Sequence, residues 1–163
     1  MTIKEPIWLE TARKFIGTSE VVGPKHNNVI LQWWRDIGLP YKDDETPWCA
    51  GFVDAMLKHS GYKFIGTAWA RAFLKYGVKL DAPALGCIVI FERGSGGHVG
   101  FVVGKDSAGN LMVLGGNQAN AVNIKPFSTS RVLGYRWPGV WPFAERFKLP
   151  LLNSDGKVSK NEA

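Results

Sequence analysis

The stretch Pro47-Trp-Cys-Ala-Gly-Phe-Val53 decides how the rest of the chain is interpreted, because it opens an apolar pattern with helical spacing. The apolar residues that share one helix face are Cys49, Phe52, Val53, Met56 and Leu57. The helical pattern begins at Trp48 and ends at Gly61. Cys49 is therefore predicted in the first turn of this helix. There the unpaired N–H groups and the helix dipole favour a thiolate. The alternative interpretation is a buried cysteine that acts as a small hydrophobic residue.

Outward from this helix, the chain divides into a helical first half and a β-prone second half. Before Cys49, the sequence predicts an amphipathic helix that starts near Trp8 and a second helix that Asn28 caps. A short helix is predicted from Ala68 to Tyr76. Beyond it, β-prone runs cover residues 87–92, 98–103, 110–114, 121–124 and 132–136. Connections this short favour antiparallel pairing. The sequence therefore predicts an α+β fold, with N-terminal helices packed on a mostly antiparallel sheet of five or six strands.

Length and composition narrow the class of protein. The chain has 163 residues, of which 45% are hydrophobic and 21% charged, as in ordinary globular proteins. We expect one domain over residues 1–150, followed by a polar tail at 151–163 that frays. A disordered protein and a disulfide-dense mini-domain are excluded, and no apolar run is long enough to cross a membrane. The net charge of +6 favours anionic partners, but without a nucleic-acid-binding motif we expect no nucleic acid partner.

Two polar residues in the β-prone half complete a candidate catalytic set. His98 begins a strand after Gly94-Ser-Gly-Gly97, and an imidazole is the usual base for a thiol nucleophile. Asn117 ends the strand that contains Leu114-Gly-Gly-Asn-Gln118, where it would orient the far imidazole nitrogen. Each segment also has an alternative interpretation when it is taken separately. His98 would then be a polar residue at the edge of the sheet, and Gly115-Gly-Asn117 would be a turn. Their order along the chain favours a Cys-His-Asn arrangement.

These segments resemble the CHAP and NlpC/P60 group of papain-like cysteine peptidoglycan hydrolases, with the closest similarity to small single-domain phage endolysins. The matching segments are Gly23-Pro-Lys-His-Asn27, Pro47-Trp-Cys-Ala-Gly-Phe-Val53, Gly86-Cys-Ile-Val-Ile-Phe91, Gly97-His-Val-Gly-Phe101, Leu114-Gly-Gly-Asn-Gln118 and Gly134-Tyr-Arg-Trp-Pro138. The resemblance implies a papain-like fold in which Cys49 is the nucleophile, His98 is the base and Asn117 orients the base.

The sequence departs from this family at two places. Cys87 stands where related sequences usually have an acidic residue, and Gly115 stands where many have a glutamate. The orienting role therefore rests on Asn117, assisted by Gln118. The Asp-rich calcium loop of some CHAP enzymes is not evident, since Asp43-Asp-Glu45 lacks the alternating ligands that would surround one ion.

Four residues are candidates for binding the substrate: Trp48, Tyr41, Gln118 and His26. Tyr41 is also a candidate oxyanion donor. For His26, the alternative to substrate binding is a loop that is held by local side-chain to backbone bonds. No metal and no cofactor are expected. A zinc site would lack the usual Cys-x-x-Cys or His-x-x-x-His spacing, and a disulfide between Cys49 and Cys87 would disable the nucleophile.

The resemblance implies hydrolysis of a peptidoglycan amide bond, in the stem peptide, the cross-link or the muramoyl–L-alanine link. The alternatives are an interbacterial amidase effector, an acyltransferase of the same fold and a non-catalytic wall-binding module. The first 15 residues carry charges where a signal peptide would be apolar. We therefore expect no signal peptide. The resemblance to endolysins implies a protein that is made in the host bacterial cytoplasm and reaches the periplasm and cell wall through a holin pore, and we expect it to be a monomer. No stable membrane insertion is expected.

Overall fold

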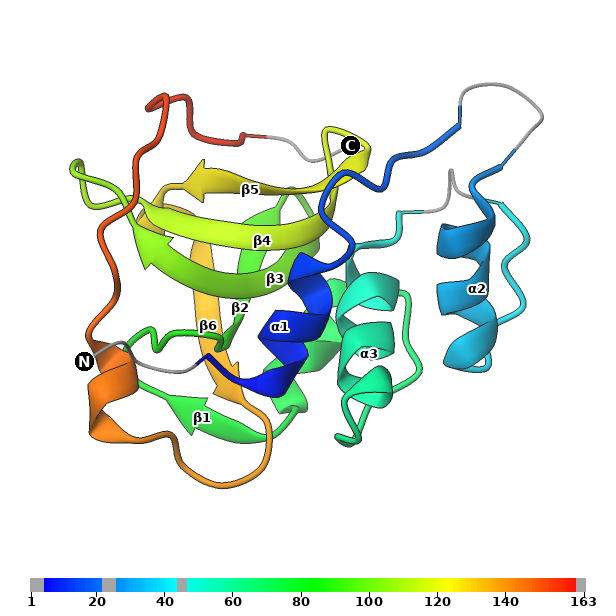
Figure 1. Ribbon diagram of the computed structural model, residues 1–163, viewed down its shortest axis with the longest axis horizontal. Helices are drawn as coiled ribbons and strands as arrows, with labels where there is room; N and C mark the ends of the chain where they lie inside the picture. The colour runs from blue at the N-terminus through cyan, green and yellow to red at the C-terminus, as the bar shows by residue number, and fades with distance from the viewer. Residues whose placement is uncertain (1–4, 22–25, 44–46, 161–163) are drawn as a thin grey trace.

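The helices precede the sheet along the chain, as the sequence predicts (Figure 1). The structure is a computed structural model that describes residues 5–21, 26–43 and 47–160. Its α-helices are α1 (Ile7–Arg13), α2 (Asn28–Asp36) and α3 (Cys49–His59). Its strands are β1 (Val78–Leu80), β2 (Ile88–Arg93), β3 (Gly96–Lys105), β4 (Leu111–Gln118), β5 (Ala121–Phe127) and β6 (Val132–Trp137). The 3-10 helices in the described part are η1 (Ala70–Lys75), η2 (Thr129–Arg131) and η3 (Ala144–Phe147).

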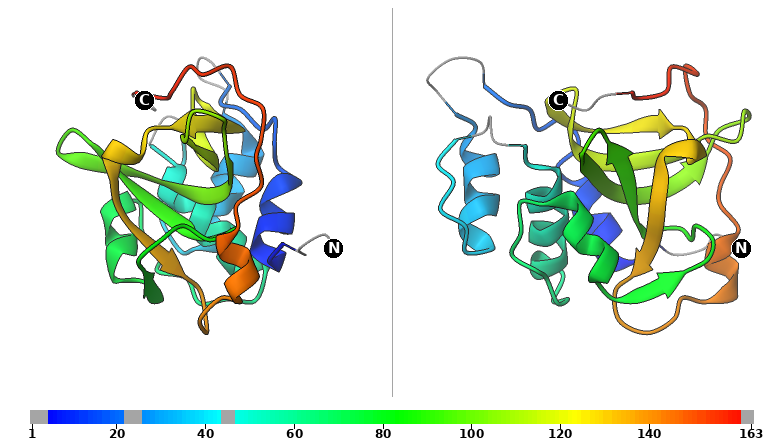
Figure 2. Two further views of the ribbon diagram at one scale, coloured as in Figure 1. Left: turned by 90° about the vertical axis from the view of Figure 1, so that its left-hand side faces the viewer. Right: turned by 180° about the vertical axis from the view of Figure 1, so that it is seen from behind.

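The six strands form one antiparallel sheet in the order β1-β6-β2-β3-β4-β5, which confirms the predicted α+β fold. The sheet curls strongly, as the rotated views in Figure 2 show. In a flat sheet, β2 and β5 would be separated by three strand spacings of about 4.8 Å each. Instead, the Phe91 ring of β2 stacks on the Phe127 ring of β5 with centroids 4.5 Å apart. The curl encloses a face on which side chains from distant strands meet.

Helix α3 packs against β3 and β4, while α1 and α2 pack on α3. Figure 1 and Figure 2 both show α3 between α2 and the sheet. Aromatic side chains join these layers: Trp33 of α2 contacts Phe52 of α3, and Phe52 contacts Phe101 of β3. This packing fixes the first turn of α3 beside the central strands.

Some element boundaries differ from the sequence prediction for local reasons. Helix α2 is capped by Asn27 and not Asn28, because the Asn27 side chain accepts a hydrogen bond from the Val29 N–H. The predicted helix at 68–76 is the 3-10 helix η1. Strand β1 was not predicted, since three residues carry too little pattern to recognise.

The segment after residue 150, which the sequence predicts to fray, is held against the sheet over its described part. Leu152 donates its N–H to the Lys105 carbonyl, and Lys105 donates to the Pro150 carbonyl. Farther on, the Ser159 N–H reaches the Pro126 carbonyl. These bonds are between backbone groups, so the polar side chains of the segment give no hint of them.

Two of the seven tryptophans are exposed, Trp69 at 60% and Trp141 at 56%, and the others lie in the core. Among the described residues, no helix has the length and apolar character needed to cross a membrane.

Candidate active site

Cys49 is the first residue of α3, where the sequence places it, and Trp48 is the N-cap. The Trp48 indole is fixed on two sides. Its Nε1 donates to Glu20 Oε1 at 2.7 Å, and its ring lies 5.7 Å from that of Trp33. Cys49 itself is 2% exposed, so it is almost completely buried. At this place the N–H groups of the first helical turn are available to a negative charge.

His98 lies near the start of β3 and is buried. Its imidazole stacks on the Phe127 ring with centroids 5.3 Å apart and only 5° between the planes. Phe91 lies on the same stack, with a centroid distance of 6.3 Å. The aromatic stack fixes the plane of the imidazole and leaves its two nitrogens at the ring edge to make polar contacts.

Gln118 makes the polar contact to the far nitrogen of this ring. His98 Nε2 lies 3.0 Å from Gln118 Oε1. The Gln118 amide nitrogen donates to the Val113 carbonyl and to the carbonyl and side-chain oxygens of Asn123, so its oxygen is the acceptor. This network assigns the proton of the neutral imidazole to Nε2 and leaves Nδ1 as the basic nitrogen.

A bulge in β4 brings Gln118 to this face. Gly115 pairs with Asn123, and Gln118 pairs with Ala121, so β4 has one extra residue between the two pairs. Asn117 within the bulge adopts a left-handed backbone, with φ of 56°. Because side chains alternate along a strand, the extra residue turns Gln118 to the face that Gly115 occupies. Asparagine tolerates this backbone better than most residues do.

Two glycines of β4 connect the histidine to the first turn of α3. A Cβ atom on Gly116 would lie 2.6 Å from the Trp48 ring, and one on Gly115 would lie 3.3 Å from His98 Nε2. The Gly115 Cβ would also overlap Gln118 Oε1. Consecutive Cα atoms are about 3.8 Å apart. The helix turn that carries the thiol and the ring that carries the base therefore pack against neighbouring residues of one strand.

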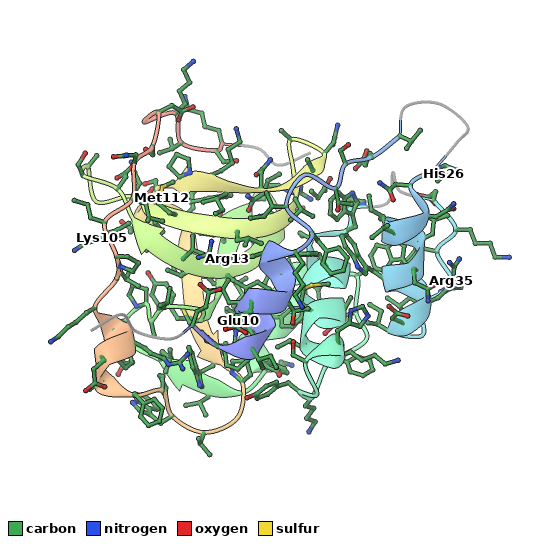
Figure 3. The ribbon with its side chains drawn as sticks, in the orientation of Figure 1. Glu10, Arg13, His26, Arg35, Lys105 and Met112 are labelled. Carbon is green, nitrogen blue, oxygen red and sulfur yellow. The ribbon has the colours of Figure 1, made fainter. Side chains whose placement is uncertain are left out.

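The structure places the other sequence-predicted residues as follows. Asn117 is buried beside the set, but Gln118 is the residue bonded to His98 Nε2. Tyr41 packs on Trp34, with ring centroids 4.9 Å apart, and is partly exposed. His26 lies at the N-terminal end of α2, in the layer beyond α3 (Figure 3). Its neighbour Asn27 accepts a hydrogen bond from the Val29 N–H, which is the local bonding given as the alternative for this loop, and it also donates to the Ser19 carbonyl. Of the Asp43-Asp-Glu45 motif, only Asp43 is among the described residues.

Two further residues support the site and were not predicted from the sequence. Glu20 accepts the Trp48 indole N–H, and Arg71 donates from Nε to the Gly96 carbonyl at 2.6 Å. The aliphatic part of Arg71 also packs against Gly97, next to His98. Both contacts join segments far apart in the chain, so no local pattern in the sequence could have indicated them.

The second cysteine, Cys87, lies just before β2 and is completely buried. Burial raises the pKa of its thiol to about 12, although the Ala84 N–H donates to its sulfur. Neither cysteine is part of a disulfide. No group of three or more metal-binding side chains occurs within residues 5–21, 26–43 and 47–160.

Comparison with known proteins adds one finding to this geometry. Residues 41–117 match the family model described as the CHAP domain. The matched range includes Tyr41, Cys49, His98 and Asn117, and it ends one residue before Gln118. Neither the curated proteins nor the solved structures yielded a match to the chain.

Proposed function

The chain carries a CHAP domain, and from this premise we propose that it is a peptidoglycan hydrolase in which Cys49 is the nucleophile, His98 the base and Gln118 the orienting residue. CHAP domains are generally cysteine- and histidine-dependent amidases or endopeptidases that act on peptidoglycan. The observation that carries the residue assignment is the bond between His98 Nε2 and Gln118 Oε1. This bond holds the proton on Nε2 and leaves Nδ1 free of a proton, so that Nδ1 can take the proton of a cysteine nucleophile.

The proposed reaction begins when His98 Nδ1 takes the proton of the Cys49 thiol. The thiolate sulfur then attacks the amide carbonyl of the wall polymer, and N–H groups of the first turn of α3 stabilise the negative oxygen. When the carbon–nitrogen bond breaks, the imidazolium gives its proton to the departing amine. A water molecule, deprotonated by the same imidazole, then hydrolyses the thioester and restores the thiol.

Gln118 serves in place of the glutamate found in many relatives. Its amide oxygen fills the space that a side chain at position 115 would need, which accounts for glycine there. A neutral amide holds the Nε2 proton without adding a negative charge beside the imidazole. Asn117 then contributes mainly through its backbone, which forms the bulge.

The test is digestion of purified peptidoglycan sacculi by the wild-type chain and by Cys49→Ala, followed by mass spectrometry of the soluble products. We expect wild type to release fragments whose new termini identify the amide bond that is cut. Cys49→Ala should lose at least about 1000-fold of this activity, while Cys87→Ala, the matched control, retains it. Equal activity in the two variants would refute the assignment.

We also propose that the biological role is lysis, as in endolysins that a holin releases into the cell envelope. The net charge of +6 supports a catalyst retained on an anionic wall by its own domain. Expression in a bacterial host should lower culture turbidity only when a holin is co-expressed. Growth arrest from secreted protein, relieved by a dedicated immunity protein, would favour the interbacterial effector instead.

A further inference from the structure

A groove of about 1150 Å³ runs along η1, outside the catalytic set described above. The loop after α3 forms one wall, from Gly61 to Ile65, and η1 forms the other. This volume exceeds that of most drug-sized ligand sites, so the groove has room for an extended ligand. The loop is anchored from behind, because the buried Asp54 carboxylate accepts hydrogen bonds from the N–H groups of residues 65, 66 and 67.

The lining of the groove is aromatic and unusually exposed. Trp69 is 60% exposed and Ile65 is 41% exposed, and Tyr62 and Phe64 also line the groove. Exposed apolar surface with this degree of clustering usually marks a binding site. Flat aromatic faces are suited to pack against the apolar faces of sugar rings.

The charged residues of the groove all have one sign. Lys63, Arg71 and Lys75 line it, and no carboxylate does. Within the described part of the chain, neither lysine takes part in an ion pair. The groove therefore presents positive charge beside aromatic surface, which is complementary to an anionic ligand with an apolar or sugar component.

The groove begins beside the histidine and ends far from the thiol. Arg71 bonds to the Gly96 carbonyl and packs on Gly97, the residue before His98. The opposite end lies at Gly61, after the last turn of α3. At 1.5 Å per residue, His59 at the end of α3 is about 15 Å from Cys49 along the helix axis, and Gly61 lies beyond it. A ligand at the Gly61 end of the groove is therefore too distant from the Cys49 sulfur to be cut, but it can belong to the same polymer as the bond that is cut.

We propose that this groove binds a second, anionic disaccharide–peptide unit of the wall polymer, adjacent to the unit that is cleaved. The inference rests on the proposed function, since it assigns part of the same substrate to a separate surface. Peptidoglycan supplies both required chemistries, because its stem peptides carry carboxylates and its glycan supplies sugar rings. The groove would thus hold the enzyme on an intact wall between cleavage events.

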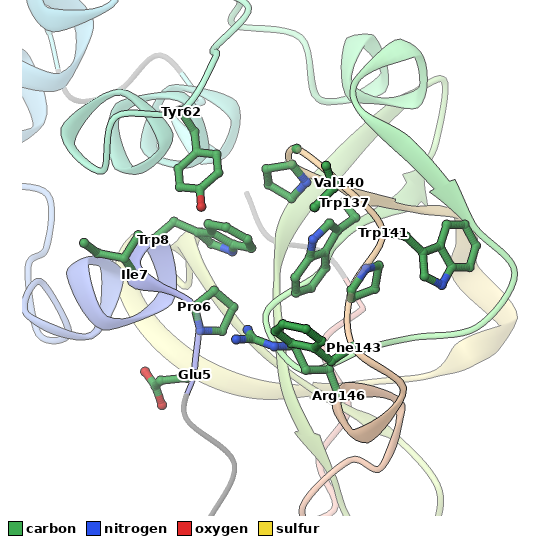
Figure 4. A pocket seen from close by; sticks show the side chains of 13 residues that line it. Glu5, Pro6, Ile7, Trp8, Tyr62, Trp137, Val140, Trp141, Phe143 and Arg146 are labelled. Atoms are coloured by element: carbon green, nitrogen blue, oxygen red, sulfur yellow. The ribbon is translucent and has the colours of Figure 1, made fainter.

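The test uses the full chain carrying Cys49→Ala, so that binding is measured without hydrolysis. Affinity for purified sacculi is compared between this protein and versions with Trp69→Ala or with Lys63→Glu and Lys75→Glu together. Trp141→Ala is the matched aromatic control, because Trp141 is 56% exposed and lines the adjoining pocket but not the groove (Figure 4). Lys14→Glu with Lys148→Glu is the matched charge control, since both lysines are exposed and neither lines the groove. Melting temperatures confirm that each variant folds.

We expect each groove variant to weaken sacculus binding by about tenfold and each control to change it less than about twofold. When the groove substitutions are made in the protein that keeps Cys49, hydrolysis of sacculi should fall more than hydrolysis of the smallest soluble fragment that the enzyme cuts. Equal binding by groove and control variants would overturn the proposal. The proposal would also be overturned if the groove variants bound sacculi normally but lost binding to vesicles of anionic phospholipid, because a lipid surface would then be the partner. If wild type cleaves no peptidoglycan while groove-dependent binding persists, the hydrolase assignment fails and the groove assignment stands.

Discussion

The two cysteines show how one residue type acquires different chemistry in two regions of a fold. Both are buried, with 2% of Cys49 and 0% of Cys87 exposed, so burial alone does not distinguish them. Cys87 lies among apolar side chains, which raises the pKa of its thiol to about 12 and keeps it protonated. Cys49 lies at the N-terminus of α3, and its helix neighbours Trp48 and Phe52 pack on Gly116 of the strand that also contacts His98. In the proposed mechanism, the backbone dipole of α3 and the base His98 make Cys49 the reactive thiol, and exposure plays the smaller part.

The same contrast extends to the strands around each cysteine. Near Cys87, β2 is a run of buried apolar residues. Beyond Gly115, β4 instead ends in a bulge and a turn in which Asn117, Ala119 and Asn120 all have positive φ. Such backbone conformations cost about 1–2 kcal/mol for residues other than glycine. The fold tolerates that cost at the place where Gln118 must reach His98.

Among the changes that test this contrast, the largest effect is expected from removal of the Gln118 side chain. Gln118→Ala should lower kcat about 10- to 100-fold, a part of the 10²–10⁴-fold that general base catalysis supplies. Asn117→Gly is the matched control, because glycine keeps the left-handed backbone and removes the neighbouring side chain. Activity measured on sacculi should be near wild type in this control. If Asn117→Gly is the more damaging change, the side chain of Asn117 is the orienting group after all.

A smaller effect is expected from adding a methyl group where β4 meets α3. Gly116→Ala places a Cβ 2.6 Å from the Trp48 ring, so the first turn of α3 must shift. We expect a loss of about 1–3 kcal/mol in the free energy of unfolding, together with reduced activity. In Gly96→Ala the added atom meets its nearest neighbour at 3.6 Å, and this control should be tolerated. Urea denaturation of both variants decides the matter, and equal destabilisation would contradict the packing argument.

Cys87 should affect stability at alkaline pH without affecting activity. Its pKa is raised from 9.0 to about 12 in the folded protein, so folding favours the neutral thiol. The corresponding stability is fully present below pH 9 and is lost as the pH rises toward 12. Cys87→Ala should therefore lose less stability than wild type between about pH 9 and 11. Parallel stability curves over this range would show that burial does not control this thiol.

The smallest effect is expected at the turn between β4 and β5. Ala119 has φ of 52°, which strains an alanine but not a glycine. Ala119→Gly should raise the free energy of unfolding by about 0.5–1 kcal/mol and leave kcat unchanged, because the turn lies beyond the catalytic residues. A stability gain accompanied by loss of activity would mean that the strain itself contributes to catalysis.

Sequence patterns located most of the fold because the helices and strands have clear apolar periods. The helix that begins at Cys49 and the strands on both sides of the Asp106–Asn110 turn follow directly from such periods. The end of β4 did not, because Gly115-Gly-Asn117 reads as a turn while the backbone still pairs with β5. The orienting residue was accordingly placed at Asn117, one position before the side chain that bonds to His98. A bulge shifts which side chains share a face, and no residue count along a regular strand can anticipate that shift.

The most direct test of the central claim is the rate of Cys49 alkylation by iodoacetamide as a function of pH. The measurement is made in the Cys87→Ala background, so that one thiol reports, and is repeated with His98→Ala. We predict that the rate rises with a midpoint well below the value of about 8.5 for a free thiol, and that His98→Ala returns the midpoint toward that value. A midpoint near 8.5 in both proteins would contradict the claim that His98 activates Cys49.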